Sequence, residues 1–95
     1  MSQNPTKKPL PEFRHLDVYE VDDVTVVHFK DQRILEDLAI QELGQELFYL
    51  VDVEHRKKLL LNFANVNFLS SGALGKLNSL EKKIRNLGGE VKLCS

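Results

Sequence analysis

The chain has 95 residues, 42% of them hydrophobic and 28% charged, which suits one globular domain with a single core. Its formal net charge of -1 argues against a protein that binds nucleic acid through its overall charge. No apolar run approaches the roughly 18 residues that a membrane-spanning helix requires. We therefore expect neither a nucleic-acid partner nor a membrane span.

The N-terminal segment is polar and rich in proline. Residues 1–12 include Lys7 and Lys8 and lack the apolar centre of a secretory signal. We expect this segment to be a flexible tail and residues 13–95 to form a single domain. Cys94 is the only cysteine, so neither a disulfide framework nor a Cys-x-x-Cys redox pair is possible. These features predict a cytoplasmic protein.

Two short strands open the predicted domain. Residues 16–21 and 24–29 are rich in Val, Leu, Tyr and Phe, and Asp22 and Asp23 between them suit a tight antiparallel turn. The second strand has apolar residues on both faces, as expected of a strand that is covered on two sides.

A helix is predicted over residues 34–52, after a polar connection at residues 31–33. Its apolar residues recur at helical spacing, namely Ala39 or Ile40, Leu43, Leu47 and Leu50. Gly44 inside this segment either weakens the helix by roughly 1 kcal/mol relative to alanine or marks a close contact. Residues 53–58 form a charged loop.

The second half repeats the strand–helix pattern. Residues 59–63 predict a buried strand, residues 64–72 a connection, and residues 73–87 an amphipathic helix that Gly88 and Gly89 end. A last strand is predicted over residues 90–94. The element order is then β-β-α-β-α-β, an α/β fold whose mixed sheet has right-handed parallel crossovers and helices on one face.

The connection before the second helix carries the chemistry of the chain. Ser70, Ser71 and Gly72 lie where a strand leads into a helix, and backbone N–H groups and the helix dipole favour a phosphate there. Either serine could instead simply cap the helix, a role that contributes about 1 kcal/mol. The glutamate of a capping box is absent, since Ala73 and Leu74 stand three residues on.

This junction and the element order resemble the STAS domain, the fold of bacterial anti-sigma factor antagonists and of related sulfate-transporter tails. The family pattern is a hydrophobic strand ending near an Asp, an apolar pair, a second Asp, a Ser or Thr, a small residue, Gly, Leu and Gly. The residues that align with this pattern without gaps are Leu59–Leu61, Asn62, Val66, Phe68, Ser70, Ser71, Gly72, Ala73, Leu74 and Gly75. The resemblance covers roughly residues 13–94.

The chain departs from the family pattern in three places. Asn62 and Ser70 stand where the family has Asp, and no C-terminal helix follows the last strand. The ungapped alignment puts Ser71 at the family's phosphoacceptor position. A register shifted by one residue would put Ser70 there instead, so Ser70 is the second choice.

The resemblance implies a regulatory protein that binds another protein. It implies a kinase-like anti-sigma partner that uses ATP, and release of that partner when it phosphorylates the serine. The implied partner-binding residues are Ser70, Ser71, Gly72, Lys76 and Asn78. The alternative is a non-phosphorylated STAS scaffold subunit of a stress-signalling or lipid-transport complex, an interpretation that Asn62 and Ser70 favour.

No other pattern in the sequence indicates catalysis or a cofactor. His15, His28 and His55 are scattered without metal-ligand spacing, and we expect ordinary surface or half-buried histidines. Ser71 does not lie on a Gly-x-Ser-x-Gly elbow, and Gly72 and Gly75 are not followed by the Lys-Ser/Thr of a phosphate-binding loop. We therefore predict that the protein is not an enzyme, since an enzyme or small-ligand binder would need a pocket that the sequence does not reveal.

The sequence stops directly after the last predicted strand. If Ser95 ends the native chain, an apolar sheet face or edge is left uncovered, and a homo-oligomer is expected. Light scattering at high protein concentration would detect it, and a strictly monomeric species would count against it.

Overall fold

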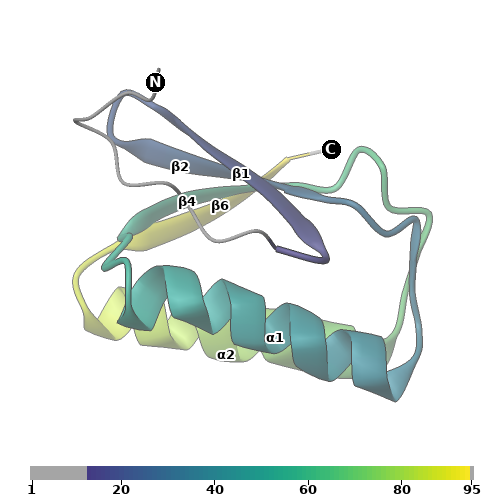
Figure 1. Cartoon of the computed structure of the whole chain (residues 1–95). Coiled ribbons are helices and arrows are strands. Elements are labelled where there is room, and N and C mark those ends of the chain that lie inside the picture. The colour runs from purple at the N-terminus through teal and green to yellow at the C-terminus, as the bar shows by residue number, and fades with distance from the viewer. Residues whose placement is uncertain (1–12, 95) are drawn as a thin grey trace.

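The computed structural model describes residues 13–94 (Figure 1). The predicted tail at residues 1–12 lies outside this range, and the domain boundary at residue 13 stays a prediction. The elements are β1 (Leu16–Val21), β2 (Val24–Phe29), β3 (Arg33–Ile34), α1 (Asp37–Asp52), β4 (Lys58–Asn62), β5 (Phe68–Leu69), α2 (Ser71–Asn86) and β6 (Glu90–Cys94).

The main sheet has four strands in the order β1-β2-β4-β6. β1 and β2 are antiparallel, whereas β4 pairs in parallel with both β2 and β6, so the predicted mixed sheet is confirmed. The hairpin turns at Asp22, whose φ of 56° is the left-handed conformation that Asp tolerates in tight turns. Gly88, with φ 83°, ends α2 as predicted.

Both helices cover one face of this sheet, with α1 and α2 side by side (Figure 1). Val27 and Leu61 are register partners on β2 and β4 and point into the core beneath the helices. Leu47, Leu80 and Ile84 meet them from the helices and are fully buried. The core thus lies between one face of the sheet and the apolar stripes of the two helices, as the helical spacing indicates.

Gly44 marks a close contact between the two helices. A Cβ atom at Gly44 would lie 3.1 Å from Cδ of Lys76, so the aliphatic stem of Lys76 packs over α1 at the position without a side chain. Of the two explanations considered for Gly44, the structure supports the close approach.

The structure differs from the sequence-based prediction at two short strands and at the first residues of both helices. β3 and β5 form a separate two-stranded parallel sheet, within segments expected to be connections. Because Ile34 belongs to β3, α1 begins at Asp37 rather than at residue 34. α2 begins at Ser71 rather than at residue 73, because Ser70 already caps it. The other strands match their predictions within one residue.

The opposite face of the main sheet carries no helix in the described part of the chain. Tyr19, Val26, Leu60 and Lys92 are successive register partners there. Leu93, the register partner of Leu61, lies on the helix-covered face instead, where it is 65% exposed at the edge strand β6. Whether the chain self-associates stays a prediction. Within residues 13–94, neither helix is long and apolar enough to span a membrane.

Candidate functional site

The candidate site is the junction where β5 leads into α2. The β2–β3 segment fixes its backbone: Asn67 N and Phe68 N donate to the Gln32 carbonyl over 2.7 and 3.2 Å, and Ser70 N donates to the Ile34 carbonyl over 3.0 Å. These bonds hold Ser70 at the end of β5, so the β3–β5 pair determines where α2 begins.

The two serines have different roles at this junction. Ser70 is the N-cap of α2, since its Oγ accepts a hydrogen bond from Ala73 N over 3.2 Å and its carbonyl accepts one from Leu74 N over 3.1 Å. Ser71 is the first helical residue and is exposed, and no hydrogen bond of its hydroxyl to the described residues is present. The capping role that sequence reasoning left open for both therefore falls to Ser70.

This difference predicts unequal effects of removing the two hydroxyls. Ser70→Ala deletes the cap and is expected to lower the free energy of unfolding by about 1 kcal/mol. Ser71→Ala removes no such bond and is expected to change it by less than about 0.5 kcal/mol. Urea denaturation of both variants measures the difference, and equal losses would contradict the assignment of Ser70 as the cap.

Exposed apolar side chains lie beside Ser71. Leu74 and Asn78 follow Ser71 at spacings of three and seven residues and share its exposed face of α2. Leu74 is 49% exposed and Phe68, just before the junction, is 53% exposed, with the Arg33 guanidinium 4.9 Å from its ring centroid. We call Phe68, Ser71, Leu74, Gly75 and Asn78 the junction surface.

The predicted partner-binding residues do not all lie on this surface. Ser71, Gly72 and Asn78 are exposed, and Ser70 is half-buried at the cap. Lys76 lies about 140° around the helix from Ser71, because α-helices have 3.6 residues per turn. Its stem packs against Gly44 of α1, so it faces the other helix rather than the open side of α2.

The first turn of α2 carries no acidic side chain. Asn62, at the position of the family's first Asp, uses its Oδ1 to accept from Ala64 N over 2.8 Å, which makes a local turn. The Glu81–Arg85 ion pair, with an N–O distance of 2.7 Å, lies further along α2. The junction surface therefore has no negative charge of its own in this first turn.

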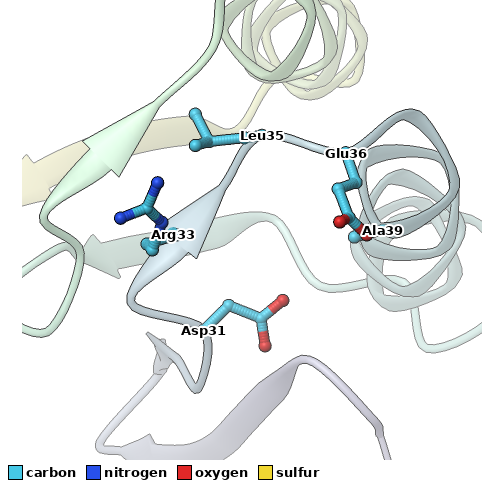
Figure 2. A pocket seen from close by; sticks show the side chains of 5 residues that line it. All are labelled: Asp31, Arg33, Leu35, Glu36 and Ala39. Atoms are coloured by element: carbon cyan, nitrogen blue, oxygen red, sulfur yellow. The ribbon is translucent and has the colours of Figure 1, made fainter.

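A shallow hollow of about 390 Å³ lies next to β3 (Figure 2). Its lining residues are Asp31, Arg33, Leu35, Glu36 and Ala39. This hollow could not be predicted from the sequence, because it is formed by a two-residue strand and the start of α1. In residues 13–94, no group of three or more His, Cys, Asp and Glu side chains is arranged to hold a metal ion.

The family of the chain follows from its sequence and agrees with this architecture. The family model described as the STAS domain matches residues 15–95. The protein therefore belongs to the STAS domain family, as the junction motif and element order indicated. No curated protein matches the chain.

Solved structures confirm the fold. The anti-sigma factor antagonist SpoIIAA in its unphosphorylated form matches with a TM-score of 0.66 at 14% identity, over 82% of this chain and 70% of that chain. The Bacillus cell fate determinant SpoIIAA in its phosphorylated form matches with a TM-score of 0.65 at 12% identity, over 80% and 68%. The chain also matches Mglu, with a TM-score of 0.65 at 16% identity, over 81% of its length but only 18% of that chain.

Proposed function

We propose that this STAS domain is a regulator of the anti-sigma factor antagonist type, which binds a kinase-like, ATP-using anti-sigma partner through the junction surface. The observation that carries the proposal is Ser71, an exposed hydroxyl at the first position of α2. The exposed Leu74 lies one turn further along the same helix face, and the exposed Phe68 lies three residues before Ser71 in β5. Exposed apolar side chains next to a modifiable group suit a surface that another protein covers. SpoIIAA, which shares the fold, has been solved with and without phosphate.

Phosphorylation of Ser71 is the proposed switch. A phosphoryl group adds about -1.5 to -2 charges, and the positive end of the helix dipole makes this position tolerant of them. Against an acidic partner group about 4 Å away, each unit of charge costs about 4 kcal/mol at an effective dielectric constant of about 20. Moving a complex from 99% bound to 1% bound needs about 5.5 kcal/mol, so one phosphate suffices.

Ser71 is favoured over Ser70 as the phosphoacceptor. The Ser70 hydroxyl is half-buried and accepts the Ala73 N–H, so its modification would disturb the cap. The Ser71 hydroxyl projects from the helix without such a bond to the described residues. A kinase can therefore reach Ser71 without unwinding the first turn of α2.

Incubation of the protein with ATP and the product of the neighbouring gene tests the proposal. We expect mass spectrometry to find one added phosphate on Ser71, retained in Ser70→Ala and lost in Ser71→Ala. Phosphate on Ser70 alone would contradict the assignment, and no phosphate with a partner that binds would favour the second function below.

A non-phosphorylated scaffold subunit of a stress-signalling or lipid-transport complex is the second candidate. This candidate is favoured because Asn62 and Ser70 stand at the two positions where the family has Asp. Asn62 is engaged in a local turn and Ser70 in the cap, so neither supplies a carboxylate to the junction. A scaffold would bind its partner equally well with Ser71→Ala and with Ser71→Asp.

We further propose that the domain binds rather than catalyses. The support is chemical: within residues 13–94 no hydrogen bond joins the Ser71 hydroxyl to a base, and the open hollow beside β3 carries charges of both signs.

A further inference from the structure

His15, just before β1, is a buried titratable group that the proposed function does not use. Its side chain is 11% exposed and lies between two carboxylates from different elements. Nδ1 is 2.8 Å from Oδ2 of Asp31 in the β2–β3 connection, and Nε2 is 2.9 Å from Oε1 of Glu42 in α1. One imidazole ring thus joins three parts of the chain.

This geometry defines the protonation state of the ring. Ionised carboxylate oxygens only accept hydrogen bonds, so both ring nitrogens must donate, which only the imidazolium form can do. Burial by itself lowers the pKa of His15, but the hydrogen bonds to Glu42 and Asp31 and the charges of Asp31 and Glu46 raise it above 6.5. A neutral ring would keep one of the two bonds and place a lone pair against the other carboxylate.

The other charged groups around His15 are Glu46, Arg14, Lys30 and Asp17, of which Glu46 favours the imidazolium and the Arg14 cation beside Glu42 opposes it. Glu46 of α1 accepts the backbone N–H groups of Arg14 and His15 over 2.9 and 3.0 Å. The Arg14 guanidinium lies 3.6 Å from Glu42, and Lys30 N donates to the His15 carbonyl over 2.8 Å while its ammonium reaches Asp17 at 3.9 Å. Three carboxylates therefore surround the ring, and the backbone bonds hold it in place from both sides.

The segment from Asp31 to Ile34 connects this cluster to the junction surface. Asp31 is bound by His15, and the next residues enter β3 beside the hollow (Figure 2). The carbonyls of Gln32 and Ile34 in that segment accept the N–H groups of Phe68 and Ser70. The segment is thus fixed by the imidazolium at one end and positions the junction backbone along the rest of its length.

We propose that His15 is a proton-operated latch, in which the imidazolium fixes the Asp31–Ile34 segment and loss of its proton loosens the backbone that presents Ser71. Below pH 6.5 the latch is closed, and it opens as the pH rises through the pKa of His15 in the folded protein. Its effect on partner binding rests on the proposed function, but the latch itself does not.

Hydrogen exchange of the free, full-length protein tests the latch without any partner. We expect the protection factors of the Phe68 and Ser70 amides, corrected for intrinsic exchange, to fall as the His15 ring titrates by NMR. Proton linkage sets the size of this decrease. The protection factors fall tenfold for each unit by which the pKa of His15 in the closed state exceeds its pKa in the open state. The amides of β4 provide a reference for global unfolding.

Variants separate the latch from general pH effects. His15→Gln should remove the pH-dependent step, and Asp31→Asn should lower the His15 midpoint and shrink the step. His28→Gln should retain the step, because His28 contacts Tyr19 rather than the cluster.

Because the titration of the wild-type protein is itself a sufficient test, a variant that fails to fold does not remove the test. Constant protection at Phe68 and Ser70 throughout the His15 titration, or a step that persists in His15→Gln, would overturn the latch, whatever the partner binding shows.

Discussion

Ser71→Asp is expected to weaken binding of the proposed anti-sigma partner at least about a hundredfold, while Ser71→Ala binds within about threefold of the wild type. The aspartate places one negative charge where the phosphate would stand, and each unit charge about 4 Å from an acidic partner group costs about 4 kcal/mol at an effective dielectric constant of about 20. Alanine removes only a hydroxyl. Isothermal titration calorimetry of the three proteins with the purified partner measures the difference.

Ser79→Asp is the matched control for this experiment. Ser79 is also exposed on α2 but lies eight residues after Ser71, about 12 Å further along the helix axis. It borders Asn78, so it adds the same charge at the far end of the junction surface, more than a Debye length of about 8 Å from Ser71. We expect its affinity to stay within about threefold of the wild type. If Ser71→Asp bound as tightly as Ser71→Ala, the switch would be wrong and the scaffold function would be preferred.

Leu61→Ala is expected to lower the free energy of unfolding by about 2–5 kcal/mol, because it leaves a cavity under the helices. Leu61 on β4 is 1% exposed and packs in the core, next to its register partner Val27. The neighbouring Leu60 points to the opposite, helix-free face and is half-buried. Leu60→Ala is therefore expected to cost less than about 1.5 kcal/mol.

Urea denaturation of Leu60→Ala and Leu61→Ala at constant pH compares the two faces of one strand. Both variants replace a leucine by alanine in the same strand, so the loss of strand propensity is the same in each. The difference between their free energies of unfolding then reports only which face of the sheet the leucine occupies. Equal losses would mean that both faces of β4 are equally covered and would contradict the one-sided arrangement of the helices.

Most of the main sheet could be predicted from the sequence because its signals are local. The hairpin has compact strands around Asp22, and the triple leucine from Leu59 to Leu61 identifies a buried strand. The recurrence of apolar residues every three or four positions predicted both helices. β3 and β5 could not be predicted, since two residues show no periodicity and their pairing joins positions more than 30 residues apart.

The candidate site was only partly predictable for the same reason. The pair Ser70 and Ser71 was visible as a strand-to-helix junction, but which serine caps α2 depends on the bond from Ser70 N to the Ile34 carbonyl. The family resemblance put Lys76 among the partner-binding residues, but its stem packs against Gly44 of the other helix, a contact between positions 32 residues apart that the sequence does not show. His15 looked ordinary because Asp31 and Glu42 lie 16 and 27 residues away in the sequence.

The central claim is that the junction surface is where the partner docks, and chemical-shift mapping tests it most directly. Addition of the unlabelled partner to ¹⁵N-labelled protein is expected to perturb the amides of Phe68, Ser71, Leu74, Gly75 and Asn78. Prior phosphorylation of Ser71 should abolish these changes. Perturbations confined to the helix-free sheet face, around Tyr19 and Leu60, would contradict the account.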